Sequence, residues 1–152
     1  MKGELTGGCL CGAVRYTLRP GFRLNPYACH CKQCQSRTGS AFSEHMQFAL
    51  ADLDLKGDLD VGTFTQPSGA NSEIFGCKTC KSRIYSTNDQ RPGMASLRCG
   101  TLDNSQNVVP AAHLWISSKQ PWINLSEGTP VCEEQPRETS EWISLLGIVD
   151  TQ

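Results

Sequence analysis

The 152-residue sequence has no excess of charge of either sign. Fourteen Lys and Arg residues oppose fifteen Asp and Glu residues, so the formal net charge is −1. Without a basic excess, neither nucleic acid nor an anionic membrane is an expected partner. Long apolar runs are also absent. The longest uncharged apolar stretches, residues 108–116 and 142–149, are far short of the roughly 20 residues that cross a bilayer.

The first ten residues contain no apolar stretch of the secretory type, so we expect a cytoplasmic protein. Apolar residues make up only 38% of the chain, but its length is typical of one domain. No internal repeat, low-complexity tract or long linker divides it. We therefore expect a single domain over residues 1–152, with its recognisable motifs within about residues 7–125.

Short alternating segments predict a mainly β, antiparallel domain. Turn-forming residues, such as Pro20-Gly21 and Pro67-Ser68-Gly69, separate these segments. Alternation in the first strand places Cys9 and Cys11 on one face. His45 falls on the polar face of its strand, so we expect it to be exposed. The expected strands are 10–18, 42–50, an alternating segment containing Leu53, Leu55, Leu59 and Val61, then 71–76, 83–86, 94–98 and 112–116.

Two short helices are expected. The first covers residues 32–38 and stops at Gly39. The second begins near Thr139 or Ser140, either of which can cap it. Its apolar face has the i, i+3, i+4 spacing of Trp142, Leu145 and Leu146, and it ends at Gly147.

Cysteine is unusually frequent for a chain of this length, with nine copies. An odd number without a secretory signal indicates metal or thiol chemistry rather than a disulfide scaffold. Two cysteines, Cys99 and Cys132, are isolated, and we expect them to be buried thiols. The other seven form three clusters, namely Cys9 and Cys11, then Cys29, Cys31 and Cys34, and finally Cys77 and Cys80.

These clusters divide naturally as four plus three around two zinc ions. Two distant pairs, Cys9/Cys11 and Cys77/Cys80, supply the four thiolates of a closed structural site. Three ligands from one short loop, Cys29, Cys31 and Cys34, leave one coordination position for water or substrate. Spacing alone does not force this partition, because His30, His45 or Cys99 can instead close the second site.

Several runs resemble the glutathione-dependent formaldehyde-activating enzyme family, a zinc-binding domain of the centromere protein V type. The similar runs are GCLCGAVRY at 8–16, CHCKQCQSRTGS at 29–40, FGCKTC at 75–80, GTLD at 100–103, and 110–123 with His113, Trp115, Lys119, Pro121 and Trp122. Lys81 replaces a glycine that usually follows the third motif, and Asn104 replaces an aspartate after the fourth.

The resemblance implies a β-tent fold, in which small antiparallel sheets are clamped by zinc. It also implies a structural zinc on Cys9, Cys11, Cys77 and Cys80, and a catalytic zinc on Cys29, Cys31 and Cys34. The activity it implies is carbon–sulfur lyase chemistry, which joins glutathione to formaldehyde as S-hydroxymethylglutathione.

Two other functions remain open at this stage. A non-enzymatic, zinc-stabilised binding module would have both metal sites fully ligated and no pocket beside Cys31. A sulfoxide reductase would use Cys99 as a nucleophile, because the segment around it faintly resembles the methionine-R-sulfoxide reductases. For the lyase, we expect a pocket over the loop 29–34. Arg37, Ser40 and Trp115 are its expected lining residues, while Lys32 and Arg37 flank the cysteine triplet.

Overall fold

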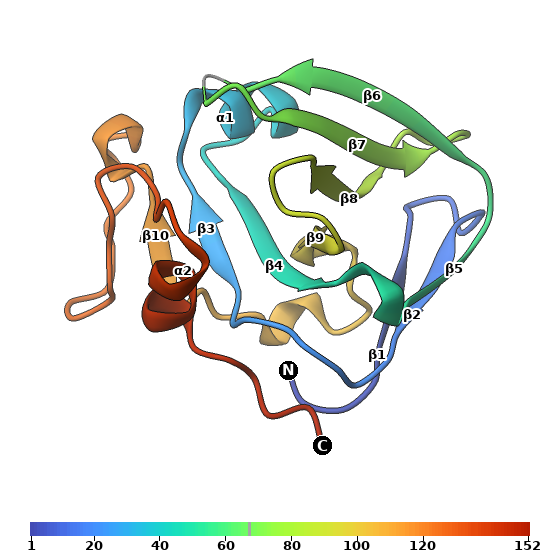
Figure 1. Cartoon of the computed structure of the whole chain (residues 1–152). Coiled ribbons are helices and arrows are strands. Elements are labelled where there is room, and N and C mark those ends of the chain that lie inside the picture. Colours follow the sequence, from blue (N-terminus) through green and yellow to red (C-terminus); the bar gives the residue numbers. More distant parts are fainter. Residues whose placement is uncertain (67) are drawn as a thin grey trace.

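The computed structural model describes residues 1–66 and 68–152. Two sheets form the molecule (Figure 1). The smaller sheet has the order β1-β2-β5 and is antiparallel throughout. Its strands are β1 (Leu5–Gly8), β2 (Arg15–Leu18) and β5 (Leu53–Lys56).

The larger sheet has the order β10-β3-β4-β9-β8-β7-β6. All its neighbours are antiparallel except β10 and β3, which run parallel and pair Ala112 with Tyr27. Its strands are β3 (Tyr27–Cys29), β4 (Ser43–Ala49), β6 (Leu59–Thr65), β7 (Asn71–Cys77), β8 (Arg83–Asn88), β9 (Met94–Arg98) and β10 (Ala112–Leu114).

Two short α-helices accompany the sheets, α1 (Lys32–Thr38) and α2 (Thr139–Leu146). Helix α1 directly follows β3 and reaches β6, where the Arg37 guanidinium lies 3.7 Å from the centre of the Phe64 ring. Four single turns of 3₁₀ helix complete the elements, η1 (Leu50–Asp52), η2 (Cys99–Thr101), η3 (Ser105–Asn107) and η4 (Ile116–Ser118). In the described part of the chain, each helix is too short to span a membrane.

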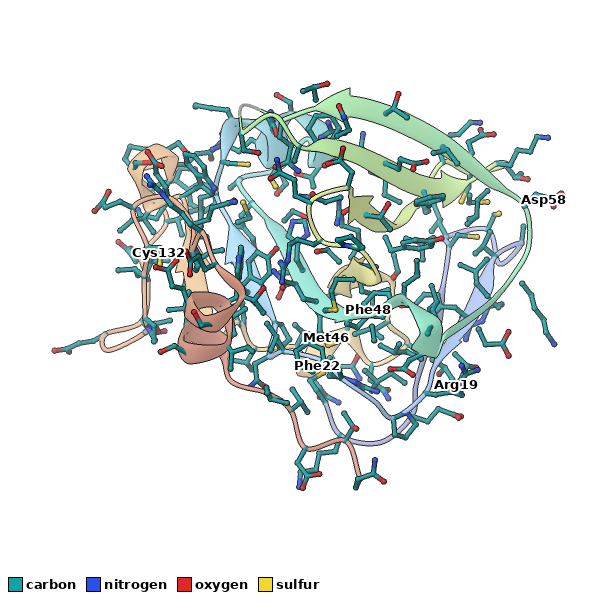
Figure 2. The ribbon with its side chains drawn as sticks, in the orientation of Figure 1. Arg19, Phe22, Met46, Phe48, Asp58 and Cys132 are labelled. Atoms are coloured by element: carbon teal, nitrogen blue, oxygen red, sulfur yellow. The ribbon has the colours of Figure 1, made fainter. Side chains whose placement is uncertain are left out.

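The main core lies where side chains of the two sheets meet. Met46 and Phe48 of β4 are fully buried at its centre (Figure 2). They pack with Tyr16 and Leu18 of the small sheet and with Leu97 of β9. A second apolar cluster packs α2 against β3 and β10 through Tyr27, Leu114, Trp142 and Leu146. Burial of these faces is the main favourable contribution to folding.

The mainly β class with short helices is confirmed, and β9 has the predicted bounds. The first predicted strand is wrong in its N-terminal half. Residues 9–12 form a turn, because Gly12 has a φ of +82° and its N–H bonds Cys9 O at 3.3 Å. Strand β1 could not be predicted from local pattern, because its two glycines disfavour a strand and it forms by pairing with β2.

The predicted bounds of α1 are confirmed, and Gly39 ends it in a left-handed conformation. The predicted cap of α2 is wrong. Glu138 is the N-cap residue and forms a capping box with Glu141, so Thr139 and Ser140 lie inside the helix. Residue 67, which belongs to the turn expected at 67–69, lies outside the described residues.

Candidate metal centres and their pocket

The first cysteine cluster joins the two sheets. Cys9 and Cys11 lie in the turn between β1 and β2 of the small sheet. Cys77 ends β7 of the large sheet, and Cys80 lies in the turn before β8. All four sulfur atoms lie within 4.8 Å of one another. Cys11 and Cys77, which are 66 positions apart in the sequence, therefore lie next to each other.

The geometry of this cluster suits a tetrahedral metal ion. The Sγ atoms of Cys9 and Cys11 are 3.6 Å apart, and those of Cys11 and Cys77 are 3.8 Å apart. A zinc–sulfur bond of about 2.3 Å in a tetrahedral site requires sulfur atoms roughly 3.8 Å apart. Backbone N–H groups also point at the sulfurs: Val14 donates to Cys9 at 3.2 Å, and Cys80 donates to Cys77 at 3.4 Å. Such donors stabilise thiolates.

Lys81 completes the turn after this cluster at a cost in backbone strain. Its φ is +65°, the left-handed region that a side chain disfavours, and its N–H donates to Cys77 O at 2.9 Å. A glycine here would adopt this conformation without strain. The side chain of Lys81 instead pairs with Asp60 on β6.

The second cluster forms around the start of α1. Cys29 ends β3, Cys31 is the N-cap residue of α1, and Cys34 lies in the first turn of the helix. Their three sulfur atoms lie within 4.8 Å of one another. The Cys34 N–H donates to Cys31 Sγ at 3.3 Å. Hydrogen bonds from Cys29 and Cys34 lower the pKa of Cys31 to about 2.

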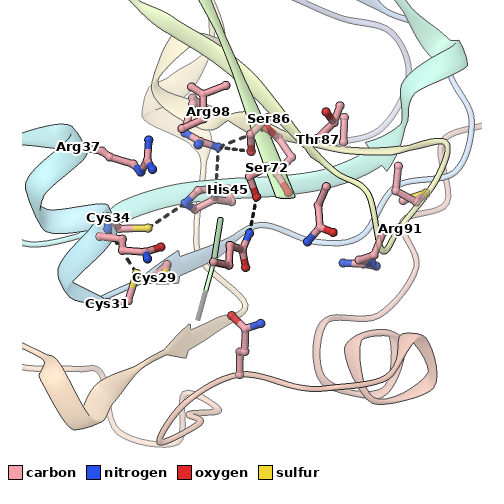
Figure 3. Close-up of a pocket in the computed structure, with 18 of the residues that line it drawn as sticks. Cys29, Cys31, Cys34, Arg37, His45, Ser72, Ser86, Thr87, Arg91 and Arg98 are labelled. Atoms are coloured by element: carbon pink, nitrogen blue, oxygen red, sulfur yellow. Dashed lines mark hydrogen bonds between the residues drawn. The ribbon is translucent and has the colours of Figure 1, made fainter. Parts of the chain in front are cut away.

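No fourth His, Cys, Asp or Glu of residues 1–66 and 68–152 joins this triplet within the same distance. A tetrahedral ion held here would therefore keep one position open. The opening faces a pocket of about 160 Å³ (Figure 3). The pocket is lined by the three cysteines together with Tyr27, Gln33, Arg37, His45, Phe64, Gln66, Ser72, Ile74, Ser86, Thr87, Asn88, Arg91, Met94, Ala95, Ser96, Arg98, Gln135 and Trp142.

His45 was expected to be exposed, and that prediction is wrong. It is only 7% exposed, because both faces of β4 are covered, and it stacks on Tyr27 at 5.2 Å between ring centres. Its Nε2 atom lies 3.6 Å from Cys34 Sγ (Figure 3). His45 contacts Cys34 alone among the triplet and does not complete the cluster.

The hydrogen bonds of His45 fix its tautomer. Arg98 Nη1 lies 2.9 Å from His45 Nδ1, and a guanidinium can only donate, so Nδ1 accepts. Burial, together with the nearby Arg98 charge, lowers the pKa of His45 well below its ordinary value. The ring is therefore neutral and carries its proton on Nε2, which donates to the Cys34 sulfur.

The other two histidines pair with each other. His30 Nε2 lies 2.9 Å from His113 Nδ1, so this ring edge is not available to the cysteine triplet. His30 is fully buried and His113 is partly buried. Neither residue closes the second cluster.

Several expected pocket residues lie elsewhere. Arg37 lines the pocket, but Ser40 and Trp115 do not. Lys32 is exposed, and Trp122 is 71% exposed. The tryptophan that lines the pocket is Trp142 of α2 and not Trp115. Helical spacing predicts that Trp142 lies on the apolar face of its helix, but it does not reveal the cavity beside this residue.

The two isolated cysteines differ in burial. Cys99 is fully buried in the main core, and burial raises its pKa to about 12. Such a thiol is a poor nucleophile at neutral pH. Cys132 is partly buried in the outer loop before α2 (Figure 2).

Comparison with known proteins gives two findings. A crystal structure of a Rhodobacter sphaeroides protein superimposes with a TM-score of 0.52 at 20% sequence identity. The match covers 70% of this chain and 98% of that one, and at this identity it shows a shared fold alone. The second finding is a match of residues 4–118 to the family model described as glutathione-dependent formaldehyde-activating enzyme. Since that match spans most of the sequence, including all seven clustered cysteines, the chain belongs to this family.

Proposed function

We propose that this protein is a zinc-dependent carbon–sulfur lyase that joins a thiol, glutathione, to formaldehyde. The product would be S-hydroxymethylglutathione. Cys29, Cys31 and Cys34 would hold the catalytic zinc, and the cluster of Cys9, Cys11, Cys77 and Cys80 would hold a structural one. The observation that carries the proposal is a triplet of thiols, without a fourth protein ligand in the described residues, that opens into a pocket.

The chemistry requires a thiolate and a carbonyl in one place. Zinc held by Cys29, Cys31 and Cys34 would supply a soft fourth position that favours the deprotonated form of an incoming thiol at neutral pH. A bond then forms between the thiol sulfur and the formaldehyde carbon while the carbonyl π bond breaks. The carbonyl oxygen gains the proton that the thiol released. The step is an addition, so neither an oxidant nor a reductant is needed.

The residues around the triplet would support this reaction. His45 donates its Nε2 hydrogen to Cys34 and so stabilises that sulfur as a thiolate ligand. Arg37 lies beside the cluster and offsets the net negative charge that three thiolates leave on a bound zinc ion. Tyr27 and Trp142, whose ring centres lie 5.3 Å apart, would add aromatic surface to the wall of the pocket.

The two alternative functions, a binding module and a sulfoxide reductase, agree less well with the structure. A binding module was expected to have a fully ligated second site and no pocket beside Cys31, whereas a pocket does lie beside Cys31. A reductase would need Cys99 as an accessible nucleophile, whereas Cys99 is fully buried with a raised pKa.

The test follows formation of S-hydroxymethylglutathione by NMR in glutathione and formaldehyde, with protein carrying two zinc ions. We expect a rate above the spontaneous reaction, and we expect Cys34→Ser to abolish this increase. Cys34→Ser should stay folded and keep one zinc, whereas Cys132→Ser should keep both ions and full activity. No acceleration by the two-zinc protein would reject the glutathione assignment. Global unfolding of Cys34→Ser would instead indicate that the second site is structural.

A further inference from the structure

Apart from the cysteine triplet, the charged side chains that line the pocket are all cationic. Its lining includes three arginines, Arg37, Arg91 and Arg98, but no aspartate or glutamate. Guanidinium groups stay charged at any pH at which the protein is folded. The pocket next to the cysteine triplet therefore presents cations without compensating carboxylates, which favours an anionic ligand.

Two of the three arginines already interact with other groups of the protein. Arg98 donates to His45 Nδ1 at 2.9 Å, to Ser86 Oγ at 3.3 Å and to Ser96 O at 3.4 Å. Arg37 covers the Phe64 ring and lies within electrostatic reach of the Cys34 and Cys31 sulfurs. Their charges stabilise the cluster and its support.

Arg91 is the remaining cation. Its guanidinium carbon lies 5.5 Å from the centre of the Trp142 ring. In the described part of the chain, its side chain makes no ion pair and no hydrogen bond to a protein group. In the same part of the chain, Asp89 forms no ion pair with Arg91, and its two carboxylate oxygens accept hydrogen bonds from Asn71 at 2.9 and 3.0 Å.

Arg91 is also placed well for recognition. It lies on the side of the pocket opposite the three cysteines (Figure 3). Its side chain is half-buried, and burial lowers its pKa, although the group stays protonated. A partly desolvated guanidinium that has no hydrogen-bond or ion-pair partner gains more binding free energy from a carboxylate than an exposed one does. Its planar group can also donate two parallel hydrogen bonds to a carboxylate.

We propose that Arg91 is a specificity-determining residue that pairs with a carboxylate of the thiol substrate, remote from the sulfur that approaches Cys29, Cys31 and Cys34. This inference rests on the proposed function for the identity of the reacting group. It restricts the substrate class to thiols that carry a carboxylate several bonds away from the sulfur. Neutral thiols would reach the cluster without using Arg91.

The first experiment compares thiols in the formaldehyde reaction. We expect Arg91→Gln to raise the KM for glutathione about 10- to 100-fold with little change in kcat, which is the usual effect of losing a hydrogen bond to a charged group. Arg91→Lys should recover part of the loss. Arg137→Gln, which removes the same charge from an exposed position outside the pocket, should match the wild type.

The diethyl ester of glutathione and 2-mercaptoethanol complete the comparison. Both lack a carboxylate, so wild type and Arg91→Gln should have equal KM values for each. An equal loss for these neutral thiols, or no loss for glutathione, would overturn the proposal.

A second measurement separates this proposal from the proposed function. S-methylglutathione has both carboxylates but no free thiol, so calorimetry with it does not require chemistry at the cluster. We expect binding to the wild type that weakens about 10- to 100-fold in Arg91→Gln. Equal binding to both proteins, or no binding to the wild type, would reject the role of Arg91. If the weakening is observed but every thiol reacts at the spontaneous rate, the lyase assignment fails and the carboxylate site stands.

Discussion

Replacing Cys77 tests whether the four-cysteine cluster holds the two sheets together. Cys77 is 0% exposed and ends β7, and its sulfur accepts from the backbone N–H groups of Thr79 and Cys80 at 3.4 Å. In Cys77→Ser, a hydroxyl replaces the thiolate. Serine stays protonated at neutral pH, so it is a poor ligand for zinc.

The size of the effect follows from the energy of metal binding. Structural zinc contributes about 10–16 kcal/mol of apparent binding free energy at pH 7, whereas a domain of this size is stable by only about 5–15 kcal/mol. Losing the closed site therefore removes an amount comparable with the whole stability. We expect Cys77→Ser to lose cooperative unfolding, measured by circular dichroism during heating, and to retain less than one zinc, measured by elemental analysis.

Cys99→Ser is the matched control. Cys99 is also 0% exposed and lies in the same core, but no other potential ligand gathers around it in the described residues. The same change there buries a hydroxyl and costs about 1–3 kcal/mol, which lowers Tm by roughly 2–4 °C per kcal/mol. Zinc content should not change. Equal losses of stability in the two variants, or cooperative unfolding of a zinc-free Cys77→Ser protein, would refute the structural role.

Two further substitutions test the strained turn and the buried histidine. Lys81→Gly relieves a left-handed residue and removes only an exposed ion pair, so unfolding in urea should show a gain of about 0.5–1 kcal/mol. Lys81→Ala, which keeps the strain, should show no gain, and a gain there would contradict this reason. His45→Phe removes the donor to Cys34, and competition with a chelator should show about 10- to 100-fold weaker zinc binding at the second cluster. His45→Gln, whose amide can still donate, should lose less; equal affinities in both variants and wild type would contradict the proposed hydrogen bond.

The grouping of the seven clustered cysteines could be predicted from the sequence because it depends on local spacing. Ligands two or three residues apart can meet one ion across a turn, at the start of a helix or, for i and i+2, along an extended strand, whatever the rest of the fold. The pair at Cys9 and Cys11 illustrates the limit of this reasoning. Alternation predicts an extended strand at this pair, whereas Gly12 turns the chain there. Both conformations bring the two sulfurs to one side.

The surroundings of the second cluster could not be predicted in the same way. His45 comes from β4, Arg98 from β9, Arg91 from the turn before β9, and Trp142 from α2. No short sequence motif connects these residues. Alternation along β4 indicates one buried face, and only the packed structure reveals that the opposite face is covered as well. The register that places His45 opposite Arg98 comes from strand pairing, which local patterns do not encode.

The wide separation of the convergent cysteines has a consequence for how the chain is made. Cys11 and Cys77 meet across 66 positions, and His30 and His113 across 83. Contacts of this range close late, because the entropy of loop closure opposes them until other interactions compensate. During synthesis, the five cysteines up to Cys34 leave the ribosome before Cys77 and Cys80 exist. An ion captured early would find Cys9 and Cys11 beside the triplet as its nearest ligands, in an arrangement that the folded protein must undo. If the two clusters bind zinc as proposed, the timing of zinc supply relative to translation would affect how this sequence folds.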